Sequence, residues 1–181
     1  MTDRGPHRAA VLTVSDLGAR GQREDTAGPV VAALLRDAGF EVADRALLPD
    51  EPDQIEERLV RWSEQGYALV ITAGGTGLSR RDCTPEATLR VIDYRVPGME
   101  EAMRAANIAA VPTAMLSRAV VGVRGHTLIV NLPGSERAAR ENLGVVLPVL
   151  AHACDSLTDD AGGARKVAAI HEQLRQLKDD A

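Results

Sequence analysis

Aromatic residues are scarce in this chain: Phe, Trp and Tyr together make up 2% of its 181 residues, so any core must be aliphatic. The chain therefore offers few rings on which nucleic-acid bases could stack. The formal net charge of −5 also argues against binding to nucleic acid or to an anionic membrane surface. A phosphate-bearing ligand would have to be held by local groups and not by the overall field of the protein.

Cysteine is equally rare, and long apolar runs are missing. The two cysteines, Cys83 and Cys154, lie far apart and match no metal-binding spacing. No stretch approaches the roughly 20 apolar residues that a membrane-spanning helix requires, and residues 1–8 show no apolar signal region. We therefore expect a soluble cytoplasmic protein without a membrane partner, in which Cys83 is a small structural residue and not a nucleophile.

The content that is present indicates an α/β protein. Apolar residues make up 45% of the chain, which fits a globular domain of ordinary size. Short apolar runs alternate with segments of helical periodicity, which predicts a three-layer fold with a mostly parallel central sheet and helices on both faces. Residues 1–158 are expected to form this domain, and residues 159–181 a polar linker and an amphipathic helical tail. The expected strands cover 9–14, 40–48, 67–72, 115–123 and 127–131, and the main helices 26–39, 54–65, 85–92, 99–107 and 136–157.

The most informative stretch is the loop that follows the apolar run 68–73. Gly74, Gly75, Thr76 and Gly77 come first, then Arg81 and Asp82, and then a helix start at Thr84-Pro85-Glu86 with Thr84 as the expected N-cap. Glycines let a ligand approach the main chain closely, and a helix N-terminus favours anions. The pattern predicts a phosphate-binding loop, with a tight turn bearing incidental charges as the structural alternative.

Three other strands are expected to end in polar residues at the same edge of the sheet. Because ligands of open α/β sheets bind at the carboxyl ends of the strands, these residues are candidates for the same site. Taken singly, they could also serve only to close turns. The candidates are Ser15, Asp16, Asp50, Asn131, Pro133, Gly134 and Ser135.

Seven ordered segments between about residues 9 and 157 resemble those of a known family. They are Leu12-Thr13-Val14-Ser15-Asp16, Leu48-Pro49-Asp50-Glu51, Thr72-Ala73-Gly74-Gly75-Thr76-Gly77, Arg81-Asp82-Cys83-Thr84-Pro85-Glu86-Ala87, Pro97-Gly98, Leu116-Ser117-Arg118 and Asn131-Leu132-Pro133-Gly134-Ser135. The chain is similar in these segments to the molybdopterin adenylyltransferases of the Mog and MoaB type, which include the adenylylating domain of gephyrin. The glycine loop with its Asp-x-Thr-Pro-Glu continuation is the specific match.

The resemblance implies a trimeric α/β protein of molybdenum cofactor biosynthesis. Its implied reaction is adenylyl transfer from ATP to molybdopterin with Mg²⁺, giving adenylyl-molybdopterin and pyrophosphate. In this family an aspartate pair that matches Asp50 and Asp82 is catalytic and binds the metal, while segments that match Ser117-Arg118 and Asn131–Ser135 line the ligand site. A molybdenum-inserting protein is a further implied partner.

The implied chemistry agrees with the residues. A phosphate monoester is already anionic at neutral pH, so it needs no strong general base to attack the α-phosphorus of ATP. The obstacle is the repulsion between two polyanions, which a metal ion, arginines and backbone N–H groups can relieve. Asp50 and Asp82 suit Mg²⁺, the residues Gly74–Gly77 suit phosphate, and Arg118 suits a bidentate phosphate contact.

Two alternatives remain open at this stage. A carrier protein could hold molybdopterin without transferring an adenylyl group, and a nucleotide-binding module from outside this pathway could use the same loop. Two departures from the family pattern bear on the choice: Glu136 stands where many members have proline, and Cys83 where valine is common. The residues after Thr158 lie outside the resemblance.

Overall fold

The computed structural model of the chain describes residues 5–158, so the predicted tail at 159–181 lies outside the described residues. Within this range, six strands form one sheet in the order β2-β1-β3-β6-β5-β4. Strands β1, β2, β3 and β6 run parallel to one another, while β5 and β4 are antiparallel to their neighbours. The expectation of a mostly parallel sheet is confirmed. The strands are β1 (Arg8–Val14), β2 (Glu41–Leu48), β3 (Leu69–Ala73), β4 (Tyr94–Arg95), β5 (Val121–Arg124) and β6 (Thr127–Leu132).

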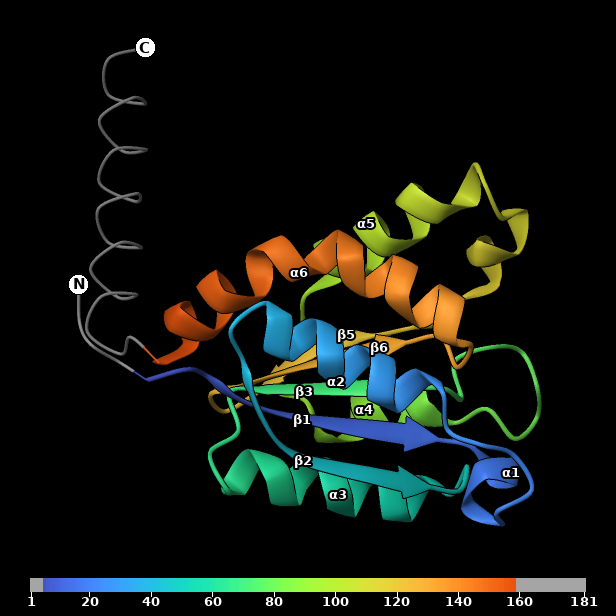
Figure 1. Ribbon diagram of the computed structural model, residues 1–181, viewed down its shortest axis with the longest axis horizontal. Helices are drawn as coiled ribbons and strands as arrows, with labels where there is room; N and C mark the ends of the chain where they lie inside the picture. Colours follow the sequence, from blue (N-terminus) through green and yellow to red (C-terminus); the bar gives the residue numbers. More distant parts are fainter. Residues whose placement is uncertain (1–4, 159–181) are drawn as a thin grey trace.

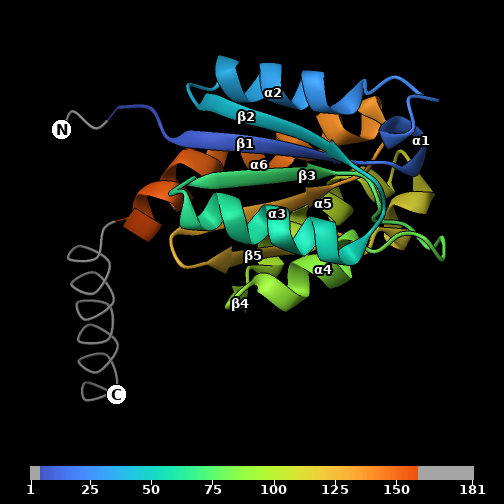
Figure 2. The same ribbon diagram turned by 90° about the horizontal axis from the view of Figure 1, so that it is seen from below.

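Helices cover both faces of the sheet, which confirms the three-layer arrangement. Figure 1 shows α2, α5 and α6 on one side of the sheet and α3 on the other, and Figure 2 shows the same layers from below. Within residues 5–158, no helix combines the length and the apolar character needed to cross a bilayer. The helices are α1 (Asp16–Ala19), α2 (Ala27–Asp37), α3 (Pro52–Glu64), α4 (Thr84–Val91), α5 (Pro97–Ile108) and α6 (Glu136–Thr158), with a 3₁₀ helix, η1, at Pro112–Leu116.

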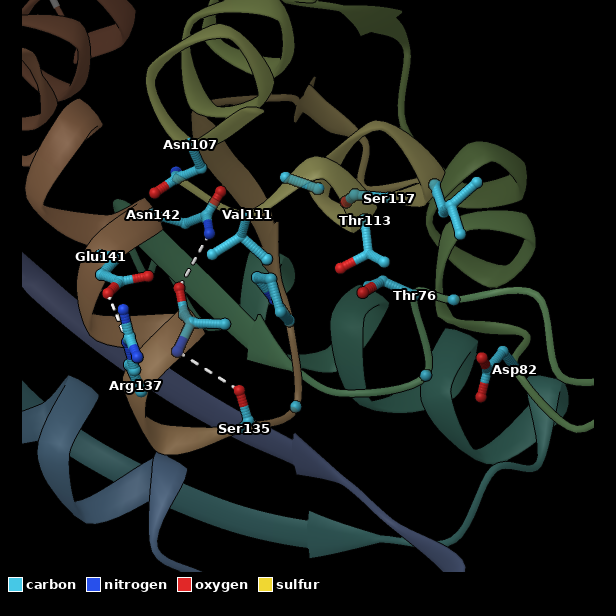
Figure 3. A pocket seen from close by; sticks show the side chains of 17 residues that line it. Thr76, Asp82, Asn107, Val111, Thr113, Ser117, Ser135, Arg137, Glu141 and Asn142 are labelled. Atoms are coloured by element: carbon cyan, nitrogen blue, oxygen red, sulfur yellow. Dashed lines mark hydrogen bonds and ion pairs between the residues drawn. The ribbon is translucent and has the colours of Figure 1, made fainter. Parts of the chain in front are cut away.

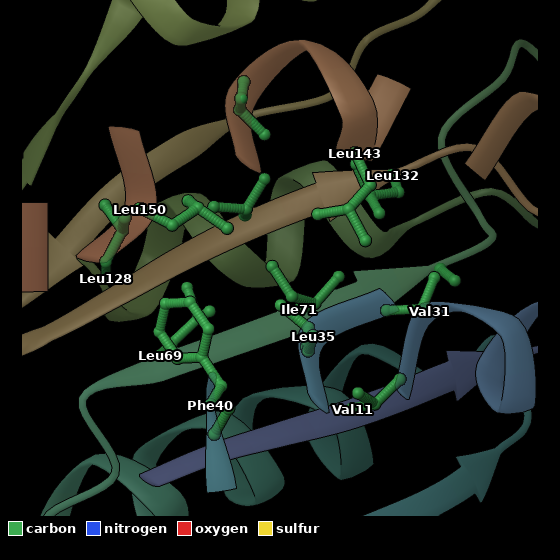
Figure 4. Packing of buried hydrophobic residues seen from close by; sticks show 14 of the residues in the cluster. Val11, Val31, Leu35, Phe40, Leu69, Ile71, Leu128, Leu132, Leu143 and Leu150 are labelled. Atoms are coloured by element: carbon green, nitrogen blue, oxygen red, sulfur yellow. The ribbon is translucent and has the colours of Figure 1, made fainter. Parts of the chain in front are cut away.

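The core is aliphatic on both faces of the sheet, as the shortage of aromatic residues requires. On the α2/α6 face, Val31, Leu35 and Leu143 pack against Ile71 of the central strand β3 (Figure 4). The opposite face is smaller and holds α3 and α4. It contains two buried rings, Trp62 and Tyr67, and the indole N–H of Trp62 donates to the carboxylate of Asp44 at 2.9 Å.

The prediction of a strand over 115–123 is wrong for most of its length. The chain instead forms η1, then an irregular segment at 117–120 that contains Ser117 and Arg118, and only then β5. Apolar residues recur through this stretch, but Met115 and Leu116 are exposed, so their presence does not mark a buried strand. The consequence is functional, because Ser117 and Arg118 lie on a loop beside the sheet edge and not within the sheet.

The start of α4 also differs from expectation. Thr84 is the first residue of α4 and not its cap, since the preceding Cys83 takes the N-cap position. The Thr84 hydroxyl is buried and has no hydrogen-bond partner among the described residues. Pro148 lies inside α6, which runs as one helix from Glu136 to Thr158. Ser135 caps this helix, because its hydroxyl accepts from the N–H of Ala138 at 3.3 Å.

One buried carboxylate fixes the short edge strand β4 to the rest of the domain. Glu100 of α5 is almost wholly buried and accepts two hydrogen bonds from Arg95, at 2.6 and 3.2 Å, and one from the N–H of Val121 at 3.0 Å. Burial alone would raise the pKa of Glu100, but the bonds from Arg95 and Val121 outweigh it and the pKa is lowered. Glu100 therefore joins α5, β4 and β5 as an ionised group.

We expect Glu100→Gln to lower the free energy of unfolding by about 1–3 kcal/mol at neutral pH, because it removes the charge that Arg95 faces. The neighbouring Glu101 is exposed, so Glu101→Gln should change stability by less than about 0.5 kcal/mol. Since the folded-state pKa is lowered, the stabilisation is present above the unfolded pKa and disappears as pH falls through the folded one. Urea titrations from pH 7 to pH 3 measure the difference, and equal effects of the two variants would contradict this role.

Candidate active site

The carboxyl ends of three parallel strands meet at Gly74. The Gly74 N–H donates to the carbonyl of Leu132 at the end of β6, at 3.0 Å. A Cβ at Gly74 would lie 2.1 Å from the carbonyl oxygen of Val14 at the end of β1, and one at Gly134 would lie 3.1 Å from the Cα of Gly74. Gly74 also has a φ of +113°. Only glycine fits there, and its absence of a side chain brings the three loops into contact.

The glycine loop presents unpaired backbone donors. Among the hydrogen bonds of residues 5–158, none uses the N–H groups of Gly75, Thr76 or Gly77, while the carbonyl of Gly75 accepts from the N–H of Thr84 at 3.1 Å. The N–H groups of Gly134 and Ser135 are likewise without an acceptor in this part of the chain. Backbone donors left free beside a helix N-terminus bind anions well, so the predicted phosphate-binding loop has the donors it needs.

Two pockets flank this loop and share one wall. The larger has a volume of about 570 Å³ and extends toward η1 and the first turns of α6. Figure 3 shows Thr76 and Asp82 on one side of it and Glu141 and Asn142 on the other. The smaller, of about 420 Å³, lies between the loop and the segment that joins β1 to α2. Residues that line both pockets are Gly75, Asp82, Gly134 and Ser135.

The two pockets differ in charge. The larger is lined mostly by amides, hydroxyls and apolar groups, including Asn107, Thr113 and Leu116, with an ion pair between Arg137 and Glu141 at its rim. The smaller contains one arginine, Arg23, against five carboxylates. A polyanion can enter such a pocket only together with a cation. The five carboxylates belong to Glu24, Asp25, Asp50, Asp82 and Glu136.

Asp50 is the buried carboxylate of the smaller pocket. It is 8% exposed, and burial raises its pKa, with the charges of Asp16 and Asp82 adding to the effect. Asp50 and Asp16 exchange hydrogen bonds: the N–H of Asp16 donates to Asp50 Oδ2 at 3.0 Å, and the N–H of Asp50 donates to Asp16 Oδ1 at 3.2 Å. Asp50 therefore carries a poorly compensated charge in a fixed position, a property of residues that bind cations.

Arg81 binds the protein itself. Its Nε and Nη2 donate to the two carboxylate oxygens of Asp16, at 2.9 and 3.0 Å, and Nη2 also donates to Glu51 at 2.7 Å. The bond from Arg81 lowers the pKa of Asp16. Neither Arg81 nor Asp16 lines the pockets, so the structure places both beside the site and not at its surface.

Arg118, expected to contact phosphate, is also engaged within the protein. Its guanidinium donates to the carbonyls of Gly77 and Asp82, at 2.7 and 2.9 Å, and forms an ion pair with Glu86. Its backbone N–H donates to the carbonyl of Thr76 at 3.0 Å. Arg118 thus holds the glycine loop in place. Its guanidinium, which was expected to bind a phosphate, is already hydrogen-bonded within the protein.

Asn131, another expected ligand contact, is fully buried. Its amide donates to the hydroxyls of Thr72 and Thr88, at 2.9 and 3.0 Å, and its Oδ1 accepts from the N–H of Val120 at 3.2 Å. Asn131 supports the segment after Ser117 from inside the domain. Thr84 is buried as well and lies behind Gly75. Of the predicted site residues, those that line a pocket are Ser15, Asp50, Gly74, Gly75, Thr76, Gly77, Asp82, Ser117, Pro133, Gly134 and Ser135.

Sequence reasoning missed the residues that reach the site from helices and from the β1–α2 connection. Asn107 and Asn142 sit on α5 and α6 and line the larger pocket; only helix packing brings them there, so no local signal marks them. Asp25 could have been found, because it precedes a helix start. Its carboxylate accepts from the N–H of Gly28 at 2.9 Å and from the hydroxyl of Thr13 at 2.9 Å.

The donor set fits the magnesium ion that the resemblance implies. A Cβ at Gly75 would lie 2.8 Å from Asp50 Oδ1, and one at Gly77 would lie 2.8 Å from Asp82 Oδ2, so both carboxylates lie against the glycine loop. Within residues 5–158 no cluster of three or more metal-binding side chains is present. One or two carboxylates, completed by water and substrate phosphates, is the usual protein contribution to an Mg²⁺ site. Cys83 beside them remains a thiol, since burial raises its pKa to about 11.

Gly75→Ala should disturb the site through Asp50. Its Cβ would lie 2.4 Å from the Thr84 hydroxyl and 2.8 Å from Asp50 Oδ1, at a φ of +64°. Gly125 has a similar φ of +55° with no atom near the Cβ position, so Gly125→Ala isolates the backbone cost of about 1–2 kcal/mol. We expect Gly75→Ala to cost about 1–3 kcal/mol more and to weaken binding of inorganic pyrophosphate at least tenfold, as measured by denaturation and calorimetry. Equal behaviour of the two variants would contradict the described packing.

Comparison with known proteins agrees with this geometry. The family model described as "Probable molybdopterin binding domain" matches residues 10–152. The molybdopterin adenylyltransferase of Haemophilus influenzae is 43% identical over 140 residues, which cover 75% of this chain and 71% of that protein. Gephyrin of Dictyostelium discoideum is 39% identical over 153 residues, and the match covers 79% of this chain but only 21% of gephyrin.

The solved structures include a similar protein as well. The molybdopterin biosynthesis enzyme MoaB of Thermus thermophilus superposes with a TM-score of 0.81 at 50% identity, over 85% of this chain and 98% of that one. Residues 10–152, which the family model matches, contain the glycine loop, both pockets and every strand from β2 to β6. The chain therefore belongs to the family of molybdopterin-binding domains.

Proposed function

We propose that this protein catalyses adenylyl transfer from ATP to molybdopterin in molybdenum cofactor biosynthesis, with release of pyrophosphate. The observation that carries the proposal is the wall shared by the two pockets, where unpaired backbone N–H groups lie beside Asp82. Because the two pockets adjoin at these residues, a substrate bound in each pocket can place its phosphates next to those of the other. The name of the Haemophilus influenzae relative supports the same reaction.

The larger pocket suits a heterocycle. Asn107, Asn142 and Thr113 offer hydrogen-bond donors and acceptors beside apolar surface, which is the mixture that a pterin or purine ring requires. The smaller pocket, with its carboxylates, suits phosphates that arrive with a cation. Each pocket takes one substrate, and their phosphates meet at Gly75, Asp82 and Ser135.

In the reaction, a phosphate oxygen of molybdopterin attacks the α-phosphorus of ATP, and the bond from that phosphorus to the bridging oxygen of pyrophosphate breaks. The nucleophile is already an anion, so this chain needs no general base. The N–H groups of Gly75, Thr76 and Gly77 and those at the start of α6 hold the phosphates in line. Arg81 and Arg118 bind carboxylates and carbonyls of the protein, so they contribute little direct charge to the ligand.

Asp50 and Asp82 would hold the magnesium ion. A magnesium ion held by these residues would supply positive charge that offsets the negative charge of the leaving pyrophosphate. The fixed position of Asp50 and its reciprocal bonds with Asp16 keep one carboxylate ready for the ion. The acidity of the smaller pocket makes this cation a condition for nucleotide binding as well as for the chemical step.

Assembly and partners complete the proposal. Ile108, Met115 and Leu116 are large apolar side chains that stay exposed on α5 and η1, and they support association into a homotrimer. The chain spans about a fifth of gephyrin, whose remaining length leaves room for a further activity in the same polypeptide. This supports a molybdenum-inserting protein as the partner that receives the product.

Asp82→Asn separates catalysis from binding. The change keeps the size of the side chain and removes its charge, so we expect molybdopterin to bind and adenylyl transfer to fall at least about a hundredfold, or ~2.7 kcal/mol in the barrier. Asp50→Asn should act in the same direction, and the double variant should lose less than the sum if both aspartates serve one ion. Turnover with ATP, Mg²⁺ and molybdopterin, together with molybdopterin titrations, provides the measurement.

Asp37→Asn is the control, because Asp37 is exposed at the end of α2 and away from both pockets. It should leave turnover and binding unchanged. A wild-type protein that binds molybdopterin tightly but forms no adenylyl-molybdopterin would be a carrier, and the proposed reaction would then be wrong. Parallel loss of binding and turnover in Asp82→Asn would instead make Asp82 a binding residue.

Light scattering tests the assembly. We expect the full chain to show three times its monomer mass at micromolar concentration, because a monomer would leave the apolar side chains of α5 and η1 in water. Met115→Lys should lower the average mass, whereas Arg80→Glu on the glycine loop should not. A monomer mass across a wide concentration range would exclude the trimer.

A further inference from the structure

We propose that Arg81 and Asp16 form a strut that fixes Asp82 relative to Asp50, and that both act as positioning residues and not as ligand contacts. The proposal rests on the proposed function, since it concerns how the two metal-binding aspartates are held at the reacting phosphates.

The first part of the strut is the contact between Arg81 and Asp16. The bidentate geometry, with two bonds of 2.9 and 3.0 Å, uses the Nε–Nη2 edge of the guanidinium, and Glu51 takes the remaining Nη2 hydrogen at 2.7 Å. Arg81 is half exposed, and single exposed ion pairs contribute little. Here, however, one guanidinium joins two carboxylates from the starts of two helices, α1 and α3, and such planar bidentate contacts fix orientation as well as distance.

The second part connects Asp16 to Asp50. Each residue donates its backbone N–H to the carboxylate of the other, at 3.0 and 3.2 Å. Asp16 therefore contacts Arg81 with its carboxylate and Asp50 with both its carboxylate and its N–H. A continuous path of hydrogen bonds runs from Asp50 through Asp16 to Arg81, and Arg81 is covalently joined to Asp82.

A third contact holds Asp82 from the opposite side. The Arg118 guanidinium donates to the carbonyls of Asp82 and Gly77, and the N–H and carboxylate of Asp82 pair with the carbonyl and N–H of Ser79. The loop between these clamps is otherwise loosely held, and Leu78 at its tip is 65% exposed. Without Arg81, the position of Asp82 would depend on Arg118, on the turn with Ser79 and on the start of α4, where the Thr84 N–H donates to the carbonyl of Gly75.

A direct phosphate contact by Arg81 is disfavoured by the same observations. Its bidentate edge is occupied, and its side chain lines neither pocket. The adjacent Arg80 provides a matched comparison. It is exposed, carries the same charge on the same loop, and takes part in none of the hydrogen bonds or ion pairs found in residues 5–158.

The experiment compares Arg81→Gln with Arg80→Gln, each of which removes one positive charge from the loop. Amide hydrogen exchange over residues 77–82 is measured in the ligand-free protein, and kcat and KM for ATP are measured with Mg²⁺ and molybdopterin. We expect Arg81→Gln to speed exchange at Ser79 and Asp82 at least about tenfold, and to lower kcat about tenfold while KM for ATP changes less than about threefold. Arg80→Gln should change none of these quantities.

Asp16→Asn should reproduce the effect of Arg81→Gln, and the double variant should be no worse than either single one, because both substitutions break one strut. An increase in KM for ATP with unchanged exchange would make Arg81 a phosphate ligand and overturn the proposal. Equal losses in Arg80→Gln and Arg81→Gln would point to the general field of the loop and would overturn it too. If the wild-type protein shows no adenylyl transfer, the proposed function fails, and the exchange comparison alone still decides whether the strut exists.

Discussion

The close approach of three backbone segments at Gly74 is the constraint on which the rest of the site depends. A side chain there would collide with the carbonyl of Val14, and the three strand ends would move apart. Because the segments touch, the N–H groups of the glycine loop and of Gly134-Ser135 lie in one wall, with a pocket on each side of it. Within residues 5–158 these N–H groups have no acceptor. The parallel register of β1, β3 and β6 aligns these ends, so the sheet acts as the frame of the site.

The use of arginines inside the protein sets the electrostatics of this wall. Arg81 and Arg118 hold loops in place, and the smaller pocket retains an excess of carboxylates. A site built in this way does not attract a polyphosphate by its own charge. Under the proposed function, such a site would take a polyphosphate together with a divalent cation, and backbone donors would supply the remaining contacts. The guanidinium groups of Arg81 and Arg118 thus bind carboxylates and carbonyls of the protein itself.

The sequence predicted the architecture because each part of it leaves a local signal. Buried parallel strands such as β3 are continuous apolar runs. Helix starts are marked by residues such as Pro85, because the fixed φ and missing N–H of proline suit the first turn of a helix. The strand expected over 115–123 failed because exposed apolar residues at Met115 and Leu116 imitate a buried run. The roles of Arg81 and Arg118 could not be predicted, since their partners lie 30 to 65 positions away, and sequence spacing says nothing about which carboxylate an arginine meets. The loops after β1, β2, β3 and β6 were located correctly at one edge of the sheet, whereas Ser117 and Arg118 were expected inside a strand and Asn131 proved to be buried. The contacts of each motif residue could be learned only from the structure.

The two outer strands of the sheet have a consequence for how this protein behaves at high concentration. β4 consists of only two residues, and its Arg95 is tied to Glu100, so that side of the sheet offers almost no free ladder for another chain. β2 is longer, but its register against β1 shifts near Ala9, and it carries the charged residues Glu41 and Arg45 in exposed positions. Short, charged or irregular outer strands resist pairing with a neighbouring molecule. Both outer strands of the described sheet therefore disfavour edge-to-edge pairing with a second molecule.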